Sequence, residues 1–427
     1  MSLSTDLQAR VYDYTQNNKM TLLEDPALAV DYKIELIRKA KHHVHIITFF
    51  WDDSSVPERL SRELNLANAR GVEVRILTSF IPTLTTDILG SGKRALNLKS
   101  KTATFSYLQL MPGRLFSVTS NLHEKMFIVD GEKAIIGGRN SSASSLNGKD
   151  MEVVMEGDIV NQAQDHFKIM QDFLIEEKIK SKCVTATDLE ACAAPVKSQG
   201  FSKEDSNFFP VQPSFAGGIE ARILSHEAVI HQRDGQLNRQ ERLVQQDDIL
   251  DTITNIKFKK LRGYNYFIMP TKRYMDYLES NLAEGNSIEM ITNSLESAKF
   301  SNNAGYIYSL PDTKRLMEQG LVLHMWERNQ KLKYVHEKVL IFDDERVVIG
   351  SHNFGTGSTS VSNEIAVEFT SKEIAKRLTD VFETEVANPL ITKTADLSLI
   401  DKQIRKYKRS IKILRTKIVE GILRETY

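Results

Sequence analysis

Two stretches of the chain place an imidazole, an amine and a carboxamide at the same spacing. Residues 122–140 read LHEKMFIVDGEKAIIGGRN, and residues 335–353 read VHEKVLIFDDERVVIGSHN. The two stretches align without a gap. The equivalent residues with reactive or polar side chains are His123 and His336, Lys125 and Lys338, and Asn140 and Asn353. Agreement over this length indicates two copies of one functional unit.

These residue types suit chemistry on a phosphodiester. A lysine ammonium and an asparagine amide bind anionic phosphate oxygens. An imidazole can attack phosphorus or transfer a proton near neutral pH. Because there are two copies, one histidine can attack while the other protonates the leaving oxygen. The duplication therefore predicts one site that is built from both copies.

Each copy has the pattern of a β-hairpin. A run of β-branched and aromatic residues follows each histidine, and alternation along a strand predicts that the histidine and lysine share one face. Glu124 and Glu337 are then expected to point away and to form structural pairs. Asp130-Gly131 is a strong turn signal. Small residues end the returning strand and allow close backbone approach, namely Gly137, Gly138, Gly350 and Ser351.

Strand–helix–strand patterns precede both copies. Residues 30–53 predict a helix followed by a strand, and a second helix leads to a strand at 72–80. The same order recurs from residue 249 to residue 294. This order predicts parallel strand pairs with crossover helices, and hence an α/β protein with two similar halves.

Composition fits a duplicated globular protein. The chain has 427 residues, of which 41% are hydrophobic and 26% are charged, so two domains are expected. Lys+Arg and Asp+Glu both number 56, which argues against a protein whose main task is to coat nucleic acid. Cys183 and Cys192 exclude a disulfide scaffold and a zinc site. We expect two free thiols, with a single local disulfide as the open alternative.

The predicted organisation has four parts. The first half covers residues 1–176, a linker covers 177–215, the second half covers 216–393, and a basic amphipathic helix covers 394–427. That helix has two interpretations: packing of its apolar stripe on the body, which is favoured, or contact with an anionic membrane. Neither a signal peptide nor a membrane-spanning segment is visible. A cytoplasmic or peripheral membrane location is expected, with export still open if a leader was removed.

The spacing of both copies resembles that of the phospholipase D superfamily. The family pattern is His-x-Lys, four residues, Asp, six residues, Gly-Gly or Gly-Ser, one residue and Asn, and neither copy departs from it. The resemblance implies two α/β/α-sandwich halves with mixed, largely parallel sheets and an active site at their interface. It also implies a metal-independent mechanism without a cofactor, which passes through a phosphohistidine. A chain with both motifs is expected to be a monomer.

The resemblance also implies roles for individual residues. The first-copy histidine, His123, would attack phosphorus, and His336 would be the acid and base. Lys125, Lys338, Asn140 and Asn353 would hold the phosphate. A carboxylate further along would orient each histidine, and Asp150 and Glu364 stand at those places. The structural positions of the motif are Asp130, Asp343, Gly137, Gly138, Gly350 and Ser351.

The second half is similar to bacterial cardiolipin-synthase-like members. The stretches that carry this likeness contain Thr292, Asn293, Ser294, Gly305 and Tyr306, whereas the loop 351–364 differs. Phospholipid cleavage with transfer to water or an alcohol is favoured. A nuclease acting on nucleic acid and an inactive phospholipid-binding protein stay open. Phe49, Phe50 and Trp51 are candidates for an apolar pocket mouth or for simple core packing.

Overall fold

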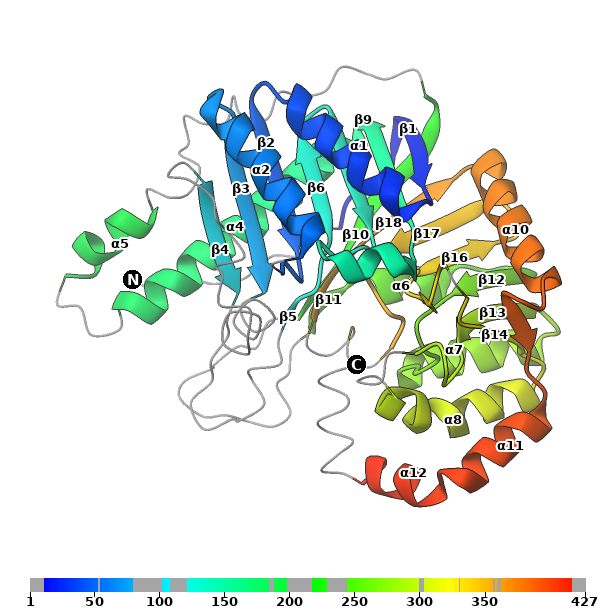
Figure 1. Cartoon of the computed structure of the whole chain (residues 1–427). Coiled ribbons are helices and arrows are strands. Elements are labelled where there is room, and N and C mark those ends of the chain that lie inside the picture. Colours follow the sequence, from blue (N-terminus) through cyan, green and yellow to red (C-terminus); the bar gives the residue numbers. More distant parts are fainter. Residues whose placement is uncertain are drawn as a thin grey trace.

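The computed structural model describes residues 11–52, 54–79, 102–107, 121–183, 188–197, 217–228, 244–298, 303–329, 331–355, 358 and 362–416. Two halves lie side by side, the first drawn in blue to cyan and the second in green to orange (Figure 1). The predicted α/β class with two similar halves is confirmed. The first half begins the chain and contains the motif copy with His123, and the second half contains the copy with His336.

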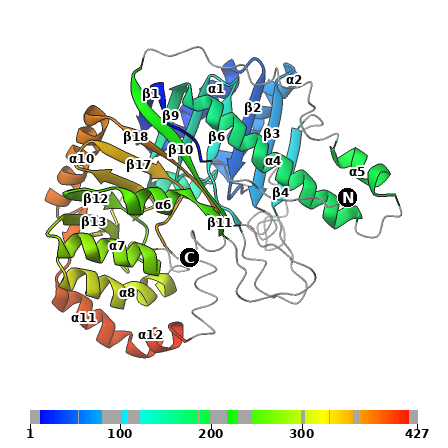
Figure 2. The ribbon, with the colours of Figure 1, turned by 180° about the vertical axis from the view of Figure 1, so that it is seen from behind.

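The first half is a sheet between helices. Its strands are β1 (Thr15–Leu23), β2 (His43–Thr48), β3 (Glu73–Ser79), β4 (Thr102–Tyr107), β5 (Asn121–Leu122), β6 (Met126–Val129), β7 (Lys133–Gly137), β8 (Gly148–Lys149) and β9 (Glu152–Gly157). Its helices are α1 (Pro26–Lys39), α2 (Ser55–Ala69), the short 3-10 helix η2 (Ala143–Asn147) and α4 (Ile159–Cys183). Helices α1 and α2 cover one face and α4 the other (Figures 1 and 2).

The second half repeats this plan. Its strands are β10 (Ile219–Ala228), β11 (Val244–Asp247), β12 (Lys260–Tyr264), β13 (Ser287–Asn293), β14 (Val322–Trp326), β15 (Tyr334–Val335), β16 (Val339–Phe342), β17 (Arg346–Gly350), β18 (Ser362–Thr370) and β19 (Thr392–Thr394). Its helices are α6 (Asp248–Asn255), α7 (Lys272–Ala283), α8 (Asn303–Glu318) and α10 (Lys372–Ala387). The expected parallel pairs are present as β2–β3 and β12–β13.

The strand order shows the pseudo-two-fold relation. The first half runs β4–β3–β2–β6–β7–β9–β1. The second runs β14–β13–β12–β16–β17–β18–β10. Strands β1 and β10 pair antiparallel and join the two sheets. A pseudo-two-fold axis between β1 and β10 therefore relates the halves.

One detail of the predicted sheet is wrong. The sheet is mixed but mostly antiparallel, whereas a largely parallel sheet was expected. The parallel pairs are β2–β3, β3–β4, β12–β13 and β13–β14, together with the short pairs β5–β18 and β8–β15. Each motif forms an antiparallel hairpin, β6–β7 or β16–β17. Strands β9 and β18 then extend the sheet in the antiparallel sense.

Helices occupy part of the predicted linker. Helix α4 continues to Cys183, and α5 (Leu189–Lys197) follows it. Residues 184–187 and 198–216 of the linker lie outside the described residues. Cys192 is bonded in a disulfide, so the expectation of two free thiols is wrong.

The C-terminal segment is helical but interrupted. Helix α11 (Leu397–Lys406) ends at Tyr407, and α12 (Lys408–Leu414) begins directly after it. Ile400 is fully buried, and Ile404, Ile411 and Leu414 pack against the core of the second half. The favoured interpretation, packing on the body, is confirmed for the described part of the segment; residues 417–427 lie outside it.

Candidate active site

Each motif histidine directly follows a short strand that pairs with a strand of the other half. Strand β5 precedes His123 and pairs with β18 of the second half. Strand β15 precedes His336 and pairs with β8 of the first half. The regular hairpin strands begin only at Met126 and Val339. We expected each hairpin strand to begin at its histidine, and this expectation is wrong. The backbone of each histidine instead bonds to the other half. The amide of His123 donates to the carbonyl of Asn363 at 2.9 Å, and the amide of His336 donates to the carbonyl of Lys149 at 2.7 Å.

The histidines and the orienting carboxylates are paired across the two halves. Nδ1 of His123 lies 2.8 Å from Oε1 and 2.9 Å from Oε2 of Glu364. Nδ1 of His336 lies 2.7 Å from Oδ2 of Asp150. The imidazole side chains are 13% and 21% exposed, whereas the carboxylates are 0% and 2% exposed. The hydrogen bond at Nδ1 fixes the orientation of each ring and leaves Nε2 free to react.

The motif lysines are buried beside the histidines. Nζ of Lys125 donates to the carbonyl of His123 at 2.5 Å, and Nζ of Lys338 donates to the carbonyl of His336. Burial is the main cause that lowers the pKa of Lys125 to about 7, and Lys338 of the other copy lowers it further, against the opposing effect of Glu364. The two lysines therefore act on each other across the halves, as expected for one shared anion site.

Both histidines are poised in the neutral form. Burial lowers the pKa of His123, opposed by Glu364, and the lysines of both copies lower it further. Burial together with Lys338 and Lys125 lowers the pKa of His336 to about 3, against the opposing effect of Asp150. A neutral imidazole is the nucleophilic form. An anion bound between the two lysines would offset their charge and raise both pKa values.

The motif asparagines complete the polar lining. Oδ1 of Asn140 and Oδ1 of Asn353 are buried without a hydrogen-bond partner among the described residues. The backbone of Asn353 is held by Asn265, whose Nδ2 lies 2.5 Å from its carbonyl. The side-chain amides of Asn140 and Asn353 can donate to a phosphate oxygen through Nδ2.

The small motif residues differ between the copies. A Cβ on Gly138 would lie only 2.3 Å from Oδ1 of Asp150, so glycine makes room for this carboxylate. At the equivalent position, Ser351 instead donates its hydroxyl to Glu364. Ser358 adds a second hydroxyl to the same carboxylate at 2.6 Å. Gly137 and Gly350 both lie against the next strand, where a Cβ would come within 2.3 Å of the carbonyl oxygen of Met151 or Ile365.

The motif aspartates fix the backbone. The Asp130 carboxylate accepts from the amides of Lys41, His42 and His43 at 2.7–2.9 Å. Asp343 accepts from Lys259 and Lys260 in the same way at 2.7–2.8 Å. Both aspartates have a φ of +53° at the hairpin turn. Each one therefore ties its hairpin to the start of the neighbouring central strand.

The alternate glutamates form buried polar pairs with structural partners, as predicted. Glu124 contacts Nε2 of His166 on α4 at 2.8 Å. Glu337 lies 3.2 Å from Nζ of Lys149, which also contacts Glu385 at 2.9 Å. Because Lys149 belongs to the first half, the second pair joins the halves behind His336.

Two polar side chains at the ends of the equivalent strands β3 and β13 position the backbone just before each histidine. The Ser79 hydroxyl accepts from the amide of Leu122 at 3.0 Å, and Oδ1 of Asn293 accepts from the amide of Val335 at 2.9 Å. Each residue so held directly precedes a histidine. Asn293 was singled out from the family resemblance, whereas Ser79 was missed, although its place at the end of the matching strand is a signal that the sequence contains.

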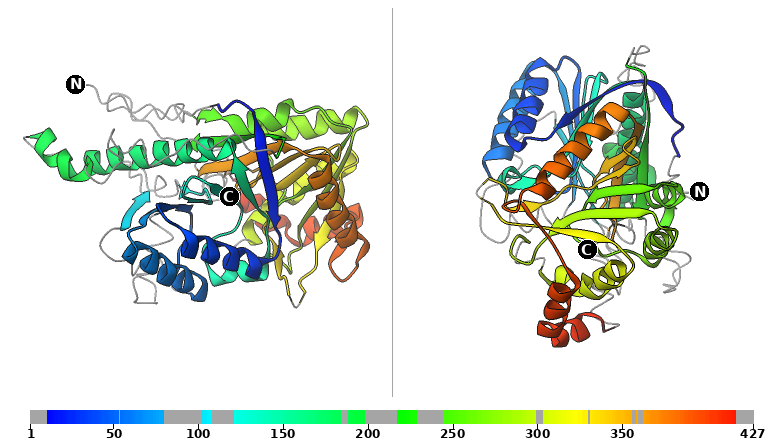
Figure 3. Two further views of the ribbon diagram at one scale, coloured as in Figure 1. Left: turned by 90° about the horizontal axis from the view of Figure 1, so that it is seen from above. Right: turned by 90° about the vertical axis from the view of Figure 1, so that its right-hand side faces the viewer.

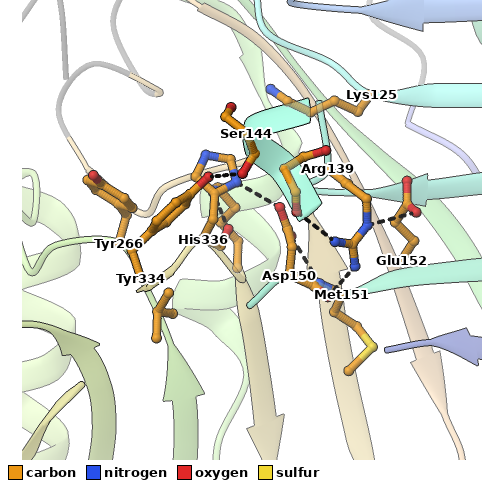
Figure 4. Close-up of polar contacts among 12 residues, drawn as sticks. Lys125, Arg139, Ser144, Asp150, Met151, Glu152, Tyr266, Tyr334 and His336 are labelled. Atoms are coloured by element: carbon orange, nitrogen blue, oxygen red, sulfur yellow. Dashed lines mark hydrogen bonds and ion pairs between the residues drawn. The ribbon is translucent and has the colours of Figure 1, made fainter. Parts of the chain in front are cut away.

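Aromatic rings flank both histidines. The Phe49 ring lies 4.8 Å from the His123 ring, while Trp51 is fully buried in the core. Tyr266 and Tyr334 flank His336, with ring centres 5.8 and 6.3 Å away (Figure 4). The sequence did not point to either tyrosine.

Two further features concern the described residues as a whole. They contain no group of three or more His, Cys, Asp or Glu side chains arranged to hold a metal ion. Within the same ranges, no helix combines the length and the apolar character that crossing a bilayer requires.

The fold and the twin motif define a phospholipase D-like protein. The family described as "Cardiolipin synthase, PLD-like domain" matches residues 34–171 and 249–386. The chain belongs to this family, and the two matches fall within the two predicted halves. The resemblance inferred from the motifs is thereby confirmed.

Relatives and solved structures agree with this membership. The chain is 23% identical to an uncharacterized protein of Helicobacter pylori, covering 84% of this chain and 77% of the relative. It is 22% identical to cardiolipin synthase 1 of Staphylococcus epidermidis (89% and 70%) and to cardiolipin synthase B of Escherichia coli (86% and 80%). The fold is similar to that of phosphatidylserine synthase from Haemophilus influenzae, with a TM-score of 0.63, 12% identity and 97% coverage of both chains.

Proposed function

We propose that the protein is a phospholipid phosphodiesterase or phosphatidyltransferase. It cleaves a phosphodiester of a phospholipid and passes the phosphatidyl group to water or to an alcohol. The observation that carries this proposal is the crossed pairing of His123 with Glu364 and of His336 with Asp150. This arrangement presents two imidazoles from opposite halves beside two lysines. The names of the cardiolipin synthase relatives support a phospholipid substrate.

The proposed reaction has two steps. His123 attacks phosphorus through Nε2 and forms a phosphohistidine, while His336 gives its proton to the leaving alkoxide. His336 then removes a proton from water or an alcohol, which attacks the phosphohistidine and releases His123. Lys125, Lys338 and the two motif asparagines bind the non-bridging oxygens. Burial, and then the charges of Lys338 and Lys125, lower the pKa of His336 to about 3. The substrate anion offsets the lysine charges, so that His336 takes up its proton when substrate binds.

The test combines turnover with trapping. Wild type, His123→Ala and His336→Ala are given phosphatidylglycerol, phosphatidylcholine and single-stranded DNA. Wild type should convert phospholipid, and each variant should lose at least about 10⁴-fold in rate. With a substrate whose leaving group needs no protonation, His336→Ala should accumulate phosphate on His123, detectable by mass spectrometry.

Other outcomes would reject parts of the proposal. Cleavage of DNA alone would identify a nuclease. Equal turnover by wild type and both variants would exclude the site. Phosphate found on His336 of the His123→Ala variant would reverse the two histidine roles.

A further inference from the structure

The end of the described chain carries a concentration of positive charge. Residues 402–416 contain seven basic residues and no acidic one, although the whole chain has 56 of each sign. Arg415 faces inward and binds Asp312 at 2.6 Å. The others are exposed and form what we call the α11–α12 basic face: Lys402, Arg405, Lys406, Lys408, Arg409 and Lys412. None of these six forms an ion pair with another described residue.

The apolar side of the same helices is already covered. Ile400 is fully buried, and Ile404, Tyr407 and Ile411 pack on the second-half core. Tyr306 of α8 also donates to Gln403 at 2.7 Å. A helix that inserts into a bilayer needs its apolar stripe for the lipid. Three large apolar side chains of these helices stay exposed, Leu397, Leu399 and Ile413. Because the continuous apolar stripe is covered, the helices present mainly charge to the outside.

Acidic groups next to the basic face are few and mostly paired. Asp401 lies 2.8 Å from Nζ of Lys314, which is also 3.4 Å from Glu318. Asp396 accepts from the first turn of α11. Glu296 is exposed near Tyr306. The six cations thus keep an uncompensated outward charge.

The position of this face suits an enzyme that works on a surface. Helices α11 and α12 form an outer layer beyond α8 (Figures 1 and 3). Arg415 holds α12 against the carbonyl of Tyr308 in the N-terminal half of α8. That end of α8 follows the segment in which Asn293 holds the backbone before His336. The basic face therefore packs on the half of the molecule that contributes His336.

We propose that the α11–α12 basic face docks the protein on an anionic phospholipid surface by electrostatic attraction, without insertion of a helix. The proposal rests on the phospholipid function given above. Each basic residue near an anionic membrane raises affinity about fivefold, and salt screens the effect. A bilayer fits better than nucleic acid, because the face has no outward aromatic ring for stacking on bases: Tyr407 packs inward.

The test is vesicle binding by charge-reversed protein. Wild type and Lys406→Glu/Arg409→Glu/Lys412→Glu are sedimented with vesicles of phosphatidylglycerol and phosphatidylcholine, and with phosphatidylcholine alone. A matched control, Lys372→Glu/Lys376→Glu/Arg377→Glu, makes the same charge change on exposed α10. We expect the α11–α12 variant to bind anionic vesicles at least about 100-fold more weakly, and the control to bind within a few-fold of wild type.

Further measurements distinguish a failure of the docking proposal from a failure of the proposed phospholipid function. Turnover of a monomeric short-chain phospholipid should be equal in wild type and the α11–α12 variant. Thermal unfolding should show that the variant is folded. If the Glu variant does not fold, Lys406→Gln/Arg409→Gln/Lys412→Gln takes its place. Equal vesicle binding by variant and control overturns the proposal, as does loss of DNA binding without loss of vesicle binding. If wild type binds anionic vesicles through this face but turns over no phospholipid, the proposed function fails while the docking surface stands.

Discussion

The two motif copies have similar backbone conformations, but the groups around the carboxylate that contacts each histidine differ. The Asp150 carboxylate lies next to Gly138. The backbone carbonyl of Asp150 accepts from Arg139 at 2.6 Å (Figure 4). Glu364 is longer, and the hydroxyls of Ser351 and Ser358 donate to it in addition to His123. A pseudo-symmetric fold thus becomes an asymmetric site at the residues where the copies differ.

This difference suits a reaction that needs two unequal histidines. Burial raises the pKa of Glu364, but His123, followed by Lys125 and His352, outweighs it and lowers that pKa to about 2. The hydroxyls of Ser351 and Ser358 add hydrogen bonds to this carboxylate. Burial raises the pKa of Asp150 as well, but His336 outweighs it and keeps the pKa below its ordinary value. Both histidines are therefore oriented by anions, while the supports of those anions differ.

The largest expected effect comes from removing the charge of either carboxylate. Glu364→Gln and Asp150→Asn should each lower kcat by about 10³ to 10⁴-fold, because the imidazole loses its fixed tautomer and its stabilised cation. Side-chain NMR of the histidines is the more discriminating measurement. Glu364→Gln should lower the pKa of His123 and leave His336 nearly unchanged, and Asp150→Asn should do the reverse. The opposite pattern would contradict the crossed pairing.

An intermediate effect should distinguish the two small residues. Gly138→Ala places a methyl group 2.3 Å from Oδ1 of Asp150, so the carboxylate must move, and kcat should fall about 100-fold. Ser351→Ala removes one of the hydrogen bonds to Glu364, and kcat should fall about tenfold. Thermal unfolding of both variants is the control. An equal loss in the two variants would mean that the asymmetry of the copies has no catalytic consequence.

The smallest expected effect is on pH dependence. With a pKa of about 7, Lys125 is charged below that pH and attracts the phosphate, and it becomes neutral as pH rises. KM should therefore increase several-fold as the pH passes through about 7. Lys125→Arg keeps its charge over this range, so its KM should change less. A parallel rise of KM in both proteins would assign the titration to another group.

Much of the fold was predictable because it depends on local patterns. The strand–helix–strand units before His123 and His336 follow from hydrophobic periodicity, and Asp25 and Thr271 cap α1 and α7 through their side chains. The direction of the wider sheet was not predictable in this way. The pairings of β1 and β10 with β9 and β18 join residues far apart in the chain, and no spacing rule specifies them.

The amino-acid sequence by itself determined which chemical groups the candidate site contains. The twin motif supplies two imidazoles, two ammonium groups and two amides, and the hairpin spacing brings those of one copy together. Asp150 and Glu364 were also identifiable as carboxylates. Their type and spacing suffice because phosphate binding and proton transfer depend on functional groups, and local strand geometry places groups that are close in sequence.

Only the tertiary structure decided which groups act together. Asp150 serves the histidine of the second half and Glu364 that of the first, because β8 and β18 each pair with the strand before the other half's histidine. The same holds for the C-terminal helices, whose apolar side is taken by the second-half core and whose charge is left outside. Sequence patterns show which face of an element is apolar or reactive. The partner of that face depends on long-range packing.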